Sequence, residues 1–117
     1  MNASISLSTL AIQNDAFRRG LPHEPALHGE RVHTAGIEAL GLEAILDIWR
    51  SVRTFEAFSE ANDPYGEHDF GAFDHPLAGK VFWKIDYYDA DLAFGSPDPQ
   101  DPALTRRVLT VLLAEEY

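Results

Sequence analysis

Ionisable and aromatic side chains are concentrated in one segment of the sequence, residues 62–91. The segment, NDPYGEHDFGAFDHPLAGKVFWKIDYYDAD, contains both lysines, two of the five histidines and seven of the 19 Asp and Glu residues of the chain. Gathering such groups in a folded protein costs free energy unless packing or function compensates. The segment is therefore the first candidate for a functional site.

The same segment has the pattern of a β-hairpin, and its register decides which side chains share a face. A connection at residues 74–79 would place Phe73 opposite Lys80. The face that packs on the core would then carry Phe70, Ala72, Val81, Trp83 and Ile85. The other face would carry Glu67, Asp69, Lys84 and Asp86, with Tyr88 close by.

The charged face of this hairpin has two chemical interpretations. Glu67 and Asp86 could form a carboxylate pair in which one pKa is raised, with Lys84 as electrostatic partner. In this alternative the protein is a small enzyme, or holds a hard metal ion, with a site formed by Glu67, His68, Asp69, Lys84 and Asp86. The simpler interpretation is a salt-bridged outer sheet face. It predicts no catalytic residue, no metal ligand and no cofactor, and we adopt it.

A protein-binding surface is the leading prediction for the segment. Exposed aromatic residues in an acidic surround often supply the binding energy of an interface. Only one of the adjacent residues Tyr87 and Tyr88 can enter the core, because neighbouring strand residues face opposite ways. Trp83 or Phe94 would join the surface if either is uncovered. The predicted interaction residues are Asp63, Tyr65, Glu67, Asp69, Asp86, Tyr88, Asp89 and Asp91.

The charge of the chain restricts its partners. The net charge is −10, from 19 Asp and Glu against 9 Lys and Arg. A nucleic-acid backbone requires a basic surface, so direct binding of nucleic acid is not expected. The complementary partner is a basic protein or a nucleic-acid-binding protein complex. Acidity that only keeps the protein soluble is the alternative.

Length and composition predict one domain, residues 1–117, with a single core. The sequence has no apolar run long enough to cross a bilayer, and its first ten residues, MNASISLSTL, do not resemble a secretory signal. We therefore expect a cytoplasmic location and no membrane contact. The chain has no cysteine, which excludes disulfides and thiolate metal sites.

The elements that must position the hairpin are predicted from capping signals and periodicity. A helix is expected over residues 8–19, with Ser8 as N-cap and Gly20 as stop, and a strand over residues 30–35. Apolar residues three and four apart predict an amphipathic helix from Ile37 onward. A last helix is expected from Asp101 to Glu116, although the run VLTVLL also allows a strand.

The charges of this last helix would oppose its dipole, with Arg106 and Arg107 at its positive end. One of these arginines is therefore expected to pair with the acids of residues 62–91. The predicted fold class is α+β. It consists of a small antiparallel sheet of three or four strands, centred on the 67–89 hairpin, with helices packed on one face.

Several motifs resemble those of a known family. They are NDAFR at Asn14–Arg18, TAG at Thr34–Gly36, NDPYGEHDFG, WKIDYYD, GSPDPQDP, TRRVLT and a closing LAEEY. Together they are similar to a bacterial family of small proteins of unknown function, and the resemblance runs from Asn14 to Tyr117. The resemblance implies no catalytic or binding residues, because none are established for that family. Members of that family often lie on plasmids and other mobile elements, which implies a role against host defences or in maintenance of the element.

Three hypotheses of function follow. The first is a non-enzymatic acidic interaction protein, an inhibitor of a nucleic-acid-handling defence complex of anti-CRISPR or antirestriction type. The second is the small enzyme described above. The third is a structural or regulatory subunit that associates with itself, so a homo-oligomer is also allowed. Metal binding would favour the second hypothesis and stable self-association the third.

Overall fold

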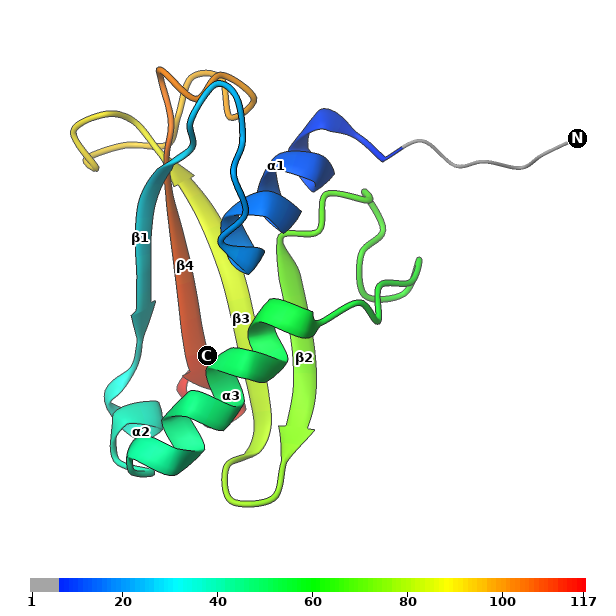
Figure 1. The fold of residues 1–117 in the computed structure, drawn as a ribbon, viewed down its shortest axis with the longest axis vertical. Coiled ribbons are helices and arrows are strands. Elements are labelled where there is room, and N and C mark those ends of the chain that lie inside the picture. The colour runs from blue at the N-terminus through cyan, green and yellow to red at the C-terminus, as the bar shows by residue number, and fades with distance from the viewer. Residues whose placement is uncertain (1–6) are drawn as a thin grey trace, which may run out of the picture.

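The helices of the protein lie on one face of a four-stranded sheet (Figure 1). The computed structural model describes residues 7–117. The prediction that the first ten residues are no secretory signal falls partly on residues 1–6, which lie outside the described residues. The helices are α1 (Thr9–Arg19), α2 (Ala35–Glu38), α3 (Leu42–Thr54) and the 3-10 turn η1 (Ala114–Glu116). The strands are β1 (His28–His33), β2 (Phe70–His75), β3 (Gly79–Tyr88) and β4 (Arg106–Leu113). The predicted α+β class, with helices on one face, is confirmed.

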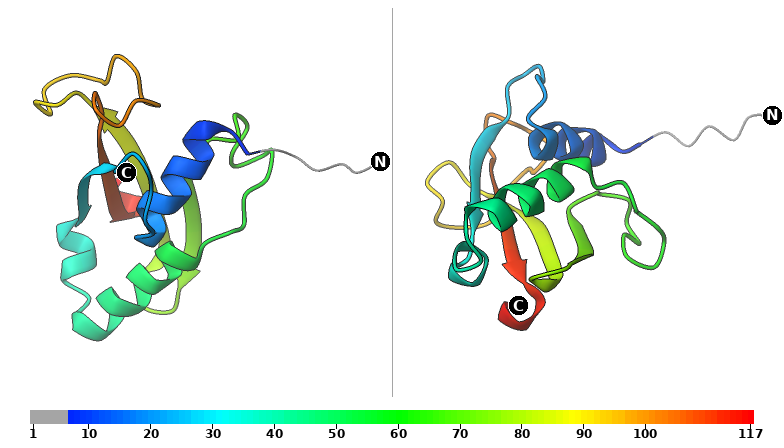
Figure 2. Two further views of the ribbon diagram at one scale, coloured as in Figure 1. Left: turned by 45° about the horizontal axis from the view of Figure 1, so that its top comes forward. Right: turned by 60° about the horizontal axis from the view of Figure 1, so that its bottom comes forward.

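The sheet has the strand order β1-β4-β3-β2 and is mixed. The pairs β2–β3 and β3–β4 are antiparallel as predicted, whereas β1 runs parallel to β4. A parallel pair needs a long connection, and α2, α3 and the hairpin supply it. Figure 2 shows from two further directions that α1 and α3 cover one face of the sheet. No helix of the described residues is long and apolar enough to span a membrane.

The N-terminal helix begins and ends where the sequence predicts. The Ser8 hydroxyl accepts a hydrogen bond from the Ala11 N–H (3.0 Å), and Gly20 ends the helix at φ 71°. Phe17 is buried as expected, but Ile12 is exposed. Only a narrow part of α1 is therefore apolar and buried, and other contacts must hold it.

The second helical segment is interrupted at Gly41, whose φ of 95° separates α2 from α3. Ile45, Ile48 and Val52 pack in the core at helical spacing, as the periodicity predicts. They meet the helix-facing side chains of the sheet, which are Val81, Trp83, Ile85, Leu109 and Val111.

The predicted register of the hairpin is wrong by one residue. Phe73 pairs with Val81 and Gly71 with Trp83, so Phe70 and Ala72 lie on the face away from the helices. The turn is shorter than expected, because Gly79 adopts φ 72° and His75 already pairs with it. Only a glycine fits opposite Trp83 in this register, since a Cβ at residue 71 would lie 2.3 Å from the indole nitrogen.

The predicted C-terminal helix is also wrong, and its strand alternative is correct. Residues 106–113 form β4, between β1 and β3. Burial along β4 largely alternates, because helices cover one face of the sheet, but Val108 and Leu112 on the other side are apolar too. The resulting apolar run imitates a helix stripe. The β-branched residues and the charges opposed to a helix dipole favour the strand.

Candidate functional site

A buried polar network joins α1 to the sheet. The Asn14 side chain donates to the Tyr87 hydroxyl (2.7 Å) and to the Glu67 carbonyl (3.0 Å). Its oxygen accepts from Nε of Arg107 (2.9 Å). Gln13 accepts from Nη2 of the same arginine (2.8 Å). These hydrogen bonds, rather than a broad apolar face, hold α1 against the sheet.

Arg107 is fully buried (0% exposed) beneath α1. Its partners are neutral: Gln13, Asn14, the Pro99 carbonyl (3.3 Å) and the ring of Tyr87. Burial lowers the pKa of Arg107. Among the described residues, neither this arginine nor Arg106 forms an ion pair with the acids of residues 62–91, so the predicted pairing is wrong.

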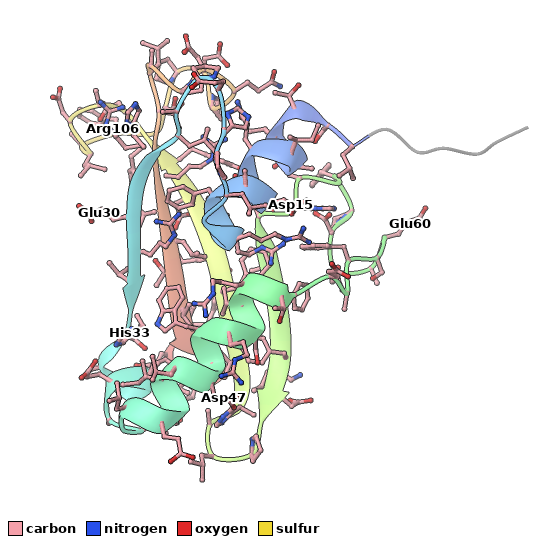
Figure 3. The ribbon with its side chains drawn as sticks, in the orientation of Figure 1. Asp15, Glu30, His33, Asp47, Glu60 and Arg106 are labelled. Carbon is pink, nitrogen blue, oxygen red and sulfur yellow. The ribbon has the colours of Figure 1, made fainter. Side chains whose placement is uncertain are left out.

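A second buried cation, Arg18 (1% exposed), lies at the other end of α1. It pairs with Asp15 (3.1 Å) and donates to the Val52 carbonyl (2.7 Å). Asp15 also accepts from Nδ1 of His68 (3.0 Å), and Asp63 lies 3.7 Å from the other ring nitrogen. Figure 3 shows Asp15 on the side of α1 that faces the loop before β2.

These contacts leave the charge balance of the surface close to that of the sequence. Arg18 and Arg107 are buried, but Asp15 is paired with Arg18 and the Asp63 side chain is 7% exposed, so the net charge of −10 is still an excess of exposed carboxylates. The exposed charge is therefore strongly negative, as a protein that binds a basic partner requires.

The environment raises the pKa of the two carboxyl groups before β2. Desolvation, with the nearby Asp69, raises the pKa of Glu67, and burial raises the pKa of Asp69. The hydrogen bond between them favours the proton on Glu67. Burial also raises the pKa of Tyr87 to about 12. Glu67 and Asp69 therefore take up protons at a higher pH than freely exposed carboxyl groups do.

The five residues of the enzymatic alternative lie in three places. Glu67 and Asp69 form one pair. His68, which has a φ of 55°, turns towards Asp15, and its ring stacks on that of Phe58 with the ring centroids 3.8 Å apart. Lys84 pairs with Asp86 (2.8 Å) on the face away from the helices. Within residues 7–117 no group of three or more His, Asp or Glu side chains is arranged to hold a metal ion. The geometry thus offers two carboxyl groups next to the half-buried Tyr87.

The predicted interaction residues also separate into different surfaces. Asp63 is drawn inward, where its carboxylate accepts from the N–H groups of Glu67 and His68. Tyr65, in the same loop, is 86% exposed. Asp86 and Tyr88 lie on the face of the sheet without helices. Asp89 and Asp91 lie in the loop after β3, away from the 63–69 loop in Figure 1.

The loop after β3 is tightly structured. We call residues 89–95 the docking loop. The Asp89 N–H donates to the Phe94 carbonyl (2.8 Å), and its carboxylate accepts from the N–H groups of Asp91 and Ala93. Gly95 returns to form a bridge with Tyr88. The sequence suggests none of this order, because the aspartates in the loop and the prolines after it predict an irregular segment.

The docking loop exposes apolar side chains among carboxylates. Phe94 is 75% exposed and Leu92 45% exposed. Leu92 has a φ of 58°, which is rare for a residue with a branched side chain. Asp91 and Asp98 are exposed nearby in sequence. Sequence reasoning identified Phe94 conditionally and missed Leu92, although an apolar triplet between two acidic turns could have marked both.

The fold and the site define a small α+β protein with helices on one face of a mixed sheet, an acidic surface and an ordered apolar loop. Residues 33–116 match the family described as protein of unknown function DUF3768, and the chain belongs to this family. The match confirms the family resemblance for β2, β3, β4 and α3, and α1 lies outside it. A search of curated proteins and a search of solved structures found no match.

Proposed function

We propose that the protein is a non-enzymatic acidic interaction protein that binds a basic protein surface through the docking loop. The observation that carries this proposal is the exposure of Phe94 and Leu92 on a loop fixed by its own hydrogen bonds. A rigid aromatic anchor loses little conformational entropy on binding. Asp91 and Asp98 beside it would attract a basic partner and orient it.

The docking loop suits this role better than the 63–69 loop. The Asp63 carboxylate is occupied by backbone N–H groups, and Glu67 and Asp69 are half-buried, whereas Asp91 is exposed. Backbone strain does not separate the two loops, because His68 in the 63–69 loop has a φ of 55° and Leu92 a φ of 58°.

A narrower form of the proposal is inhibition of a nucleic-acid-handling defence complex, of anti-CRISPR or antirestriction type. Its support is the excess of carboxylates over cations, which could occupy a groove built for phosphates, and the mobile-element context that the sequence resemblance implies. A plasmid or phage challenge of cells with and without the defence system would test this form separately.

The proposal itself is tested by affinity capture from bacterial lysate followed by a direct binding measurement. Phe94→Ala and Asp91→Lys are compared with Leu77→Ala and Glu60→Lys. The controls remove an exposed leucine of the β2–β3 turn and reverse an exposed acid on the far side of the molecule from Arg106 (Figure 3).

A basic partner should be captured by the wild type and by both control variants. Loss of the Phe94 side chain should weaken binding by about 2 kcal/mol, or roughly thirtyfold, as for an interface anchor. Asp91→Lys should weaken binding most at low salt, because exposed charges are screened by salt. Equal binding by Phe94→Ala and Leu77→Ala, with both proteins folded, would refute the role of the docking loop.

A further inference from the structure

The outer edge of the sheet at β1 is open. Among residues 7–117, β1 pairs with β4 alone, and five of its six residues are exposed. The other edge strand, β2, has the 55–69 loop beside it in Figure 1, whereas little of the chain lies beyond β1. An edge strand that is neither covered nor paired is a template for another strand.

The pairing with β4 identifies which backbone groups face outward. The Thr34 N–H donates to the Val111 carbonyl, so the even-numbered residues of β1 direct their N–H and C=O groups at β4. Successive residues alternate in this respect. Gly29, Arg31 and His33 therefore direct theirs away from the sheet. Within residues 7–117 no hydrogen bond to these six backbone groups is found.

β1 has few of the features that protect a free edge. It contains no proline, and its register with β4 runs without interruption from His28 to His33. The guanidinium of Arg31 is turned back to α1, where it donates to the Phe17 carbonyl and lies 4.3 Å from the centre of the Phe17 ring. Glu30, which projects from β1 in Figure 3, is left as the free charge along the edge.

The open edge leads to the docking loop. His28 at the start of β1 pairs with Arg106, and Arg106 pairs with Tyr88, which precedes the loop. The loop lies beside the start of β1 in all three views of Figures 1 and 2. A strand added to β1 would therefore have the carboxylates and apolar side chains of the loop at one end.

We propose that the bound partner contributes an extended segment, rich in Lys or Arg, that adds to the outer edge of β1 as a fifth strand. This proposal rests on the proposed function and specifies how the partner is held. Main-chain hydrogen bonds would supply affinity, and Glu30 and the docking loop would select basic side chains.

A second copy of the chain fits this edge poorly. Two antiparallel copies of β1 related by a twofold axis set one residue opposite itself. When the axis passes through residue 30, this places the free charge of the edge, Glu30, against Glu30 of the other copy. Each chain also carries a net charge of −10. The occupant is therefore a segment of a different, basic protein.

The test uses the full chain and a six-residue peptide of alternating Lys and Val, the length of β1. Amide hydrogen exchange and NMR titration report on individual N–H groups. Added peptide should protect the N–H groups of Gly29, Arg31 and His33, while that of Val32 is protected from the start by β4. A peptide of alternating Glu and Val is the control and should give no protection.

The matched variants are Arg31→Pro and Arg31→Ala. Both remove the same side chain, and only proline also removes the outward N–H, which an edge strand tolerates. Arg31→Pro should bind the peptide at least about tenfold more weakly than Arg31→Ala. Equal binding by the two variants, or no protection of these amides at any peptide concentration, would overturn strand addition. Protection of the Val32 N–H shows that each variant is folded.

The two proposals can fail independently. If Phe94→Ala abolishes capture of the partner while Arg31→Pro and Arg31→Ala capture it equally, the docking loop is correct and strand addition is wrong. If Phe94→Ala captures the partner normally while Arg31→Pro does not, the open edge is correct and the docking loop is wrong.

Discussion

Replacement of Asn14 by alanine removes the centre of the network that holds α1. The side chain is fully buried and forms three hydrogen bonds, with Nε of Arg107 (2.9 Å), the Tyr87 hydroxyl (2.7 Å) and the Glu67 carbonyl (3.0 Å). Alanine favours the helix but leaves all three partners without this contact. The buried guanidinium loses most, because its remaining partners are neutral.

The expected cost follows from these three bonds. A hydrogen bond to a charged group contributes about 1.5–3 kcal/mol, and each of the other two about 1 kcal/mol. Relaxation and entering water reduce such sums, so we expect a loss of about 3 kcal/mol in the free energy of unfolding. At about 4 °C per kcal/mol for a chain of this size, the melting temperature should fall by roughly 12 °C. A domain stable by about 5–15 kcal/mol would stay folded.

Urea unfolding followed by tryptophan fluorescence measures this loss, because Trp83 is buried in the core. The matched control is Ile12→Ala in the same helix, where the side chain is 49% exposed and the change should stay within about 0.5 kcal/mol. In a double-mutant cycle, Asn14→Ala and Tyr87→Phe should be less than additive, since both remove the same bond. A loss below about 1 kcal/mol for Asn14→Ala would refute the role given to this network.

Three further predictions concern the hairpin. The folded state holds the Tyr87 proton more tightly, with a pKa of about 12, so stability should fall between about pH 10 and 12, and thermal melts of Tyr87→Phe should lack this fall. Desolvation and Asp69 raise the pKa of Glu67, so the folded state binds this proton more tightly than the unfolded state does. The resulting stabilisation is complete below the unfolded pKa of 4.5 and is lost as the pH rises through the folded pKa. Glu67→Gln should therefore raise the melting temperature at about pH 7 and change it little at about pH 4, and equal shifts would contradict this. Gly71→Ala places a Cβ 2.3 Å from the Trp83 indole nitrogen, so urea unfolding should show a loss of about 1–3 kcal/mol, and unchanged stability would exclude this packing.

The parts of the fold that sequence predicts are those decided by local chemistry. Ser8 and Gly20 mark the ends of α1, and the spacing of Ile45, Ile48 and Val52 marks α3, because capping and helical periodicity act over a few residues. The register of the hairpin depends on a nonlocal fact, the space that Trp83 needs above Gly71. The strand β4 depends on neighbours on both sides, which no window of sequence contains.

The candidate site follows the same division. Sequence reasoning grouped the carboxylates of residues 62–91 by their closeness along the chain. The fold instead turns Asp63 inward, raises the pKa of Glu67 and leaves Asp91 exposed in a separate loop. The partners of Arg107 could not be found either, because Asn14 and Gln13 lie 93 and 94 residues away in the chain and carry no charge to suggest the pairing.

Hydrogen bonds connect the network beneath α1 to the docking loop. Gln13 donates to the Gln100 carbonyl (2.9 Å), and Arg107 donates to the Pro99 carbonyl (3.3 Å), so α1 holds the segment that follows the loop. The buried hydroxyl of Thr105 then joins Ser96 (2.8 Å) to the Asp98 carbonyl (2.8 Å). A loop held at its base loses less entropy on binding, which raises affinity without a new contact. Weaker binding in a variant of α1 would therefore reflect a looser loop, and only substitutions at the exposed tip, such as Phe94→Ala, identify residues that touch the partner.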